Sequence, residues 1–158
     1  MATWQFDVYL VPRSKLETVL GEIPERISPA QFDSTTWWDD AALPPGYTQL
    51  LSSFLSEQRS WSTELRTWGA EDGNRIDVGY TGTALSDVRV RFDLRHVDIG
   101  FVEAVVRLAQ KADCWLVTEE LEAIPPLTEK LFTEVMNSSA RRFTVDPKAF
   151  LEDGQSDT

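Results

Sequence analysis

Arginine side chains between positions 75 and 95 are the groups in this chain best suited to bind an anion. All bases in this stretch are arginines, and they stand at Arg75, Arg89, Arg91 and Arg95. A guanidinium is planar and binds a carboxylate or a phosphate at two points. The stretch holds four arginines and three aspartates, a charge of +1, whereas the whole chain carries −11. These arginines predict an anion-binding surface, and the alternative is a solvent-exposed face of cross-strand ion pairs.

Acidic and aromatic residues form the second group of candidates. The windows 27–58 and 112–129 contain no lysine or arginine but several carboxylates, and the first also contains two adjacent tryptophans. Adjacent side chains cannot both face inward from a strand, and on a helix they lie about 100° apart. We therefore expect one tryptophan to be partly exposed, as in a protein-binding hot spot. The alternative is an irregular arm that one or both tryptophans hold in the core. The predicted partner-binding residues are Trp37, Trp38, Asp39, Asp40, Glu119 and Glu120.

Residues for catalysis or metal binding are scarce. The chain has one histidine, His96, and one cysteine, Cys114, so a zinc site would depend mostly on carboxylates. Asp77 and Asp93 could face each other across a hairpin, but arginine neighbours would lower their pKa values, and a general acid near neutral pH needs the opposite shift. No P-loop, dinucleotide fingerprint or nucleophile elbow is present. The sequence predicts no metal site, no cofactor and no catalytic residue, and it favours a non-enzymatic protein over an enzyme.

A β-meander is the element that must position the arginines. Apolar and charged residues alternate strictly over Val88–Arg95, which predicts a strand with one buried face and one wet face. Residues 75–80 repeat this pattern, and residues 79–82, with two glycines, are predicted as the hairpin turn between the two strands. Residues 64–68 are predicted as a third strand. A shift of one residue would bury the arginines, so the register is well specified.

The remaining elements follow from periodicity and from capping residues. We expect a first strand over 4–11, a helix capped by Ser14 and ending at Gly21, a helix over 47–59, a helix over 99–112 capped by Asp98, a strand over 114–117 and a helix opened by Pro125-Pro126. The order is β-α-α-β-β-β-α-β-α. It predicts one α+β domain over residues 1–151, with a mainly antiparallel sheet of about five strands, helices mostly on one face and a disordered tail over 152–158.

Composition narrows the class of function. No apolar run approaches the roughly 20 residues of a membrane span, and a single cysteine fits a reducing compartment, so we expect a cytoplasmic protein. The acidity argues against nucleic-acid binding, which requires a basic surface. The leading hypothesis is a protein that binds another protein, such as an immunity-type or antitoxin-type inhibitor of a basic partner. A small-anion-binding protein or enzyme is the alternative, and self-association through the meander is a third. The sequence does not indicate the oligomeric state.

Overall fold

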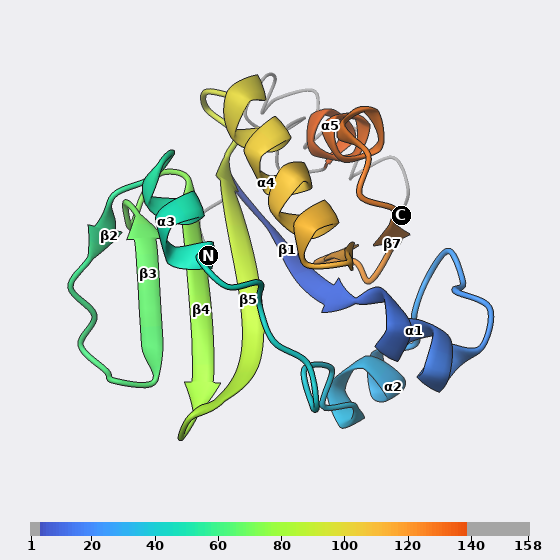
Figure 1. The fold of residues 1–158 in the computed structure, drawn as a ribbon. Helices are drawn as coiled ribbons and strands as arrows, with labels where there is room; N and C mark the ends of the chain where they lie inside the picture. The colour runs from blue at the N-terminus through green and yellow to red at the C-terminus, as the bar shows by residue number, and fades with distance from the viewer. Residues whose placement is uncertain (1–3, 139–158) are drawn as a thin grey trace.

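The structure is a computed structural model of the chain that describes residues 4–138 (Figure 1). These residues form one antiparallel sheet with strand order β2-β3-β4-β5-β1-β6-β7, together with five helices. The strands are β1 (Gln5–Pro12), β2 (Glu57–Gln58), β3 (Leu65–Gly69), β4 (Arg75–Thr81), β5 (Ala84–Asp93), β6 (Cys114–Thr118) and β7 (Ala123–Ile124). The helices are α1 (Arg13–Leu20), α2 (Pro29–Ser34), α3 (Tyr47–Ser52), α4 (Ile99–Lys111) and α5 (Thr128–Asn137). The predicted domain end at residue 151 and the predicted tail, 152–158, lie outside the described residues.

The single antiparallel sheet confirms the predicted α+β class, although it has more strands than the five expected. The additional strands, β2 and β7, have two residues each and lie at opposite edges of the sheet. Such short segments show no alternation in the sequence, so periodicity could not find them.

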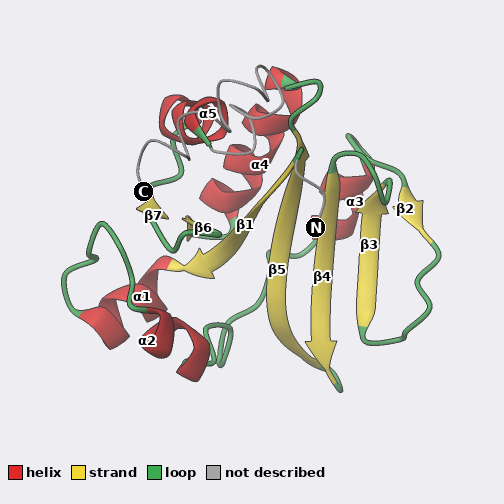
Figure 2. Ribbon diagram, turned by 180° about the vertical axis from the view of Figure 1, so that it is seen from behind, coloured by secondary structure: helices red, strands yellow, loops and turns green. Residues whose placement is uncertain are grey.

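Helices α3, α4 and α5 cover one face of the sheet, while α1 and α2 lie beyond the end of β1 (Figures 1 and 2). Helix α4 packs across the centre of the sheet, where Phe101 meets Phe92 at a ring-centroid distance of 5.3 Å, edge to face. The Asp98 carboxylate accepts a hydrogen bond from the Phe101 amide at 3.2 Å, which confirms the predicted cap. Helix α4 contributes seven buried residues to the core. In the described part of the chain, no helix is both long and apolar enough to cross a membrane.

The central meander has the predicted register. Val88, Val90 and Phe92 of β5 are buried and the residues between them are not, and Val90 lies opposite Ile76 of β4. The turn is shorter than predicted, because β4 continues to Thr81 and leaves only two residues, Gly82 and Thr83, in the connection. Gly82 has a φ of +63°, the left-handed conformation that two-residue hairpin turns require.

Helix α5 begins at Thr128 and not at the predicted Pro125-Pro126. Two other helix boundaries also differ from the prediction. Helix α1 begins at Arg13, directly after the last residue of β1, and no side chain caps it, so the Ser14 cap is wrong. Helix α3 ends at Ser52, although its apolar stripe continues for one further turn in which the Leu55 amide donates to the Leu51 carbonyl. The chain then changes direction because Glu57 and Gln58 pair with β3.

Candidate functional site

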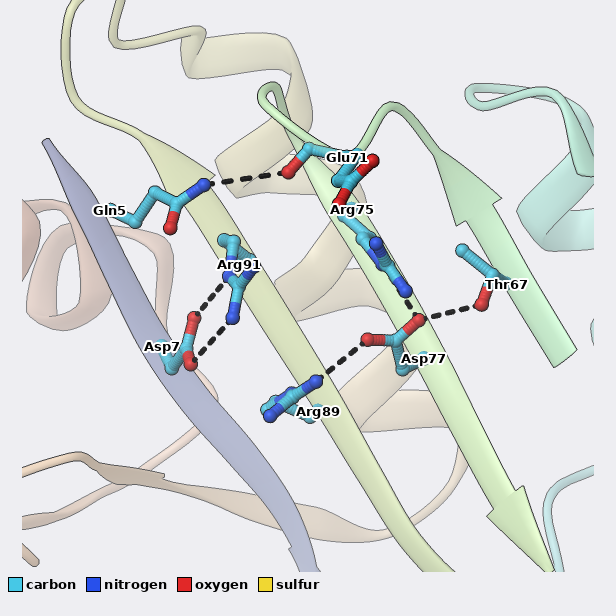
Figure 3. Close-up of polar contacts among 8 residues, drawn as sticks. All are labelled: Gln5, Asp7, Thr67, Glu71, Arg75, Asp77, Arg89 and Arg91. Carbon is cyan, nitrogen blue, oxygen red and sulfur yellow. Dashed lines mark hydrogen bonds and ion pairs between the residues drawn. The ribbon is translucent and has the colours of Figure 1, made fainter. Parts of the chain in front are cut away.

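The sheet face opposite α3, α4 and α5, here called the open face, carries a network of arginines and aspartates (Figure 3). The register creates it, because Asp77 of β4 lies opposite Arg89 of β5, and Asp7 of β1 lies opposite Arg91. Asp93 lies opposite Gln5 of β1. The expectation that Asp77 and Asp93 face each other across the hairpin is therefore wrong.

Asp77 is the centre of this network. Its carboxylate accepts hydrogen bonds from Arg75 Nε at 2.9 Å, Arg89 Nη2 at 3.0 Å and the Thr67 hydroxyl at 2.8 Å, and the residue is only 4% exposed. Burial alone would raise the pKa of Asp77, but the three donors outweigh burial and hold the pKa below its ordinary value. Asp77 is therefore an ionised carboxylate that joins β3, β4 and β5.

The other predicted arginines are also paired with carboxylates. Arg91 donates to both Asp7 oxygens, at 3.0 and 3.5 Å. Arg95 binds Asp93 through Nε and Nη2, both at 3.0 Å, and its guanidinium lies 4.6 Å from the centre of the Trp4 ring. A ligand anion at these positions would have to compete with the protein's own carboxylates. This geometry agrees with the alternative of cross-strand ion pairs.

Both tryptophans of the predicted partner-binding surface are buried. Trp37 is 7% exposed and Trp38 is 4% exposed, so the expectation of a partly exposed indole is wrong. The Trp37 indole donates to the Phe32 carbonyl at 3.0 Å, and that of Trp38 donates to the Leu10 carbonyl at 3.1 Å. The two residues lie in a turn after α2, where neither the strand rule nor the helix rule for side-chain direction applies. They hold the connection between α2 and α3 against the sheet.

Asp39 and Asp40 are exposed, as a partner-binding role requires, but they lie apart from the glutamates. They line a pocket of about 490 Å³ together with Tyr47 and Tyr80, whose hydroxyls hydrogen-bond to each other. Glu119 and Glu120 line a different pocket. The predicted surface is therefore divided into two.

Glu119 and Glu120 form the tip of the β6–β7 hairpin and are exposed. The turn is closed by a hydrogen bond of 2.8 Å from the Leu121 amide to the Thr118 carbonyl, and Leu121 has a φ of +66°. The tip borders a hollow of about 410 Å³, here called the acidic hollow. Its lining residues are Phe6, Thr118, Glu119, Glu120, Glu122, Glu134, Asn137 and Ser138.

Among the described residues, little positive charge offsets the carboxylates of the acidic hollow. Glu119 is exposed as a whole residue, but its carboxyl group is partly buried, and this burial, together with the charges of Asp7 and Glu120, raises the pKa of Glu119 to about 7. Partial burial and the neighbouring glutamates, Glu122 first among them, also raise the pKa of Glu134. Within residues 4–138, one ion pair reaches the hollow, from Arg26 to Glu122 at 3.0 Å. The hollow is thus suited to receive a cation.

A cleft beside β2 brings Arg75, a predicted anion-binding residue, together with Arg59 and Trp61, which were not predicted as site residues. It has a volume of about 520 Å³, and Trp61, which is 90% exposed, forms part of its wall. The lining residues are Gln58, Arg59, Ser60, Trp61, Leu65, Thr67, Gly69, Ala70, Glu71 and Arg75. The sequence around Trp61 does indicate that this residue is exposed. Trp61 stands between two serines, and no apolar periodicity includes it.

The described residues contain neither a reactive cysteine nor a cluster of metal ligands. Cys114 is buried, and burial raises the pKa of its thiol to about 12, so it is not a thiolate at neutral pH. Among the described residues, no group of three or more histidine, cysteine, aspartate or glutamate side chains could hold a metal ion.

Comparisons with known proteins give no family assignment. No protein-family model matches the chain, and no curated protein or solved structure shows significant similarity to it. Function must therefore be argued from the surfaces described above.

Proposed function

We propose that this chain is a non-enzymatic cytoplasmic protein that binds a basic protein partner, in the manner of an immunity-type inhibitor, and that the acidic hollow contacts the partner. The observation that carries the proposal is the group of four glutamates around the hollow, of which only Glu122 has a cationic partner in residues 4–138. The net charge of −11 supports it, because complementary potentials speed the encounter of two proteins.

The raised pKa values of Glu119 and Glu134 favour a cationic ligand on energetic grounds. Each carboxylate is destabilised when it ionises, first by partial burial and then by the negative charges of its neighbours. A lysine or arginine of the partner would relieve this repulsion and would lower both pKa values. Binding near pH 7 would therefore release protons, which is a signature that a purely apolar contact would not give.

The roles of Asp39 and Asp40 change within this proposal. Because Trp37 and Trp38 are buried, they can act only by holding the loop that presents the two aspartates. The aspartates remain candidates for a secondary contact, on a surface separate from the hollow.

The first experiment is affinity capture from the native host's lysate at low and high salt, read by mass spectrometry. A basic partner that salt releases is the expected result. Its affinity is then measured by calorimetry for the wild type and for the triple variant Glu119→Gln, Glu120→Gln, Glu134→Gln, in buffers of different ionisation enthalpy to count released protons.

A charge-matched control separates the hollow from general attraction. The triple variant Asp33→Asn, Asp72→Asn, Glu103→Gln removes the same charge from exposed positions that do not line the hollow. The proposal expects a loss of affinity of at least about tenfold for the first variant and a small loss for the control. Equal losses would show a long-range effect of net charge, and unchanged affinity in both would remove the hollow from the interface.

A further inference from the structure

The cleft beside β2 is chemically the opposite of the acidic hollow. It lies between residues 58–61 and the ends of β3 and β4, near the other edge of the sheet. Its charged lining residues are Arg59, Arg75 and Glu71, which sum to +1 in a chain of −11. We propose that this cleft binds a small organic anion that carries a flat ring, with Trp61 stacking on the ring and the two arginines binding the anionic group.

Trp61 is the residue that favours a ligand with a flat ring. It is the most exposed of the large apolar side chains in residues 4–138, and it makes no ring contact or hydrogen bond there. Trp37, Trp38 and Trp68, by contrast, are buried and each donates an indole hydrogen bond. An indole offers a large flat surface at low conformational cost, and rings stack on it in offset or edge-to-face arrangements. Trp61 at the wall of the cleft is placed to cover such a ligand.

Arg59 and Arg75 favour a ligand with a negative charge. Arg59 is exposed and makes no ion pair with any described residue. Arg75 is held by Asp77 through Nε alone, so its two terminal nitrogens, as far as the described residues go, have no acceptor (Figure 3). A guanidinium with free terminal nitrogens can bind a carboxylate or a phosphate at two points. Asp77 fixes the Arg75 side chain in place, so little rotational freedom would be lost on binding.

The shape of the cleft limits the size of the ligand. Its volume of about 520 Å³ is within the range of small-molecule sites. One side is formed by backbone, because Gly69 and Ala70 contribute little or no side chain. Glu71 is the one acidic lining residue, and the two arginines, Arg59 and Arg75, outnumber it. A single ring with one anionic group fits this combination of indole, guanidiniums and flat backbone.

The test uses the full chain labelled with ¹⁵N, and it follows the indole signals of the six tryptophans by NMR during titration. The compounds are benzoate and phenyl phosphate as ring-bearing anions, cyclohexanecarboxylate as a non-planar carboxylate, inorganic phosphate as an anion without a ring, and benzylamine as a ring-bearing cation. We expect benzoate or phenyl phosphate to shift the Trp61 signal, with weaker effects from the other three. The better of the two identifies the anionic group.

Two exposed variants and one control complete the test. Trp61→Ala and Arg59→Gln leave the core intact, and each should weaken binding of the better ligand by about tenfold. Arg107→Gln removes an equal charge from the exposed side of α4 and should leave the affinity unchanged. No change at Trp61 with either ring-bearing anion would overturn the proposal. So would equal binding of benzylamine, of inorganic phosphate or of cyclohexanecarboxylate.

Discussion

Replacing Asp77 with asparagine tests whether the open face stabilises the fold. Asparagine has the same shape but no charge, and its single oxygen cannot satisfy three donors. Breaking a fully buried ion pair costs about 3–5 kcal/mol. The Arg75 and Arg89 side chains are 19% and 35% exposed, so water can partly solvate them after the change. We therefore expect Asp77→Asn to lower the free energy of unfolding by about 2–3 kcal/mol at pH 7.

The effect of Asp77→Asn should depend on pH. The pKa of Asp77 is lower in the folded protein than its ordinary value of 3.8. A carboxyl group of this kind stabilises the fold above the pKa of the unfolded chain, and this contribution is lost as the pH falls through the folded pKa. The difference between wild type and variant should therefore be complete at pH 7 and at pH 5, and should narrow below pH 3.8.

Urea denaturation followed by circular dichroism measures both effects, because the midpoint and slope give the free energy of unfolding. Asp33→Asn is the control, since Asp33 is exposed and forms no ion pair in the described chain, and it should change stability by less than about 0.5 kcal/mol. A cost for Asp77→Asn of under about 0.5 kcal/mol at pH 7 would refute a structural role for the network. A difference that stayed constant down to pH 3 would refute the assignment of an ionised carboxylate.

Three further substitutions test other parts of the structure. Phe92→Ala removes a ring that packs on Phe101 in the core and should cost about 3–4 kcal/mol in urea denaturation; a cost below about 1 kcal/mol would contradict the packing. Gly69→Ala would place a Cβ 2.1 Å from the Asn74 carbonyl oxygen, and Gly69 has a φ of +98°, which alanine rarely adopts. We therefore expect the free energy of unfolding to fall by more than about 2 kcal/mol, measured by thermal melting. An unchanged melting temperature would show that this turn can move. Glu119→Gln should stabilise the fold by about 1 kcal/mol at pH 8, after allowance for solvent screening. The reason is that a carboxyl group whose pKa is raised from 4.5 to about 7 destabilises the fold when it is ionised. The gain in stability should disappear at pH 4.5, and a gain that persisted there would contradict the raised pKa.

Periodicity predicted the parts of the fold in which one face of an element is buried. The alternation of β5 and the broad apolar face of α4 each placed their residues correctly, because burial on one side leaves a regular pattern in the sequence. The end of α3 was not predictable in this way. Its stripe includes Phe54 and Leu55, which still pack against the core although the helix ends at Ser52 and the chain continues in single turns. Tertiary pairing of β2 with β3 decides the boundary there.

The candidate sites were harder to predict, because exposure depends on neighbours that are distant in the sequence. The alternation correctly assigned Asp7 and Asp77 to the face away from the helices, but both are buried, at 6% and 4% exposure. Arginines of the same and of neighbouring strands bind both carboxylates, and side chains of this length bury the groups that they lie against. Trp61 is the opposite case, an apolar side chain that is exposed. Its residue type favours the core, but it is the most exposed large apolar side chain in the described residues.

The two proposed sites should act independently of each other, because the ion-pair network lies between them. The cleft borders β3 and β4, and the acidic hollow borders β6, which is three strands away from β4 in the order β4-β5-β1-β6. At about 4.8 Å per strand the separation is about 14 Å or more, beyond the Debye length of about 8 Å at physiological ionic strength. Between the two sites, Asp77 pairs with Arg89 and Asp7 pairs with Arg91, so the charges of these guanidiniums are offset locally. Glu119→Gln should therefore change the affinity of the cleft for benzoate by less than about 1.5-fold in 0.15 M salt, and by more in 0.01 M salt, where the Debye length is about 30 Å. A large change at 0.15 M salt would mean that the open face transmits charge between the edges of the sheet, and the two sites would then have to be treated as one.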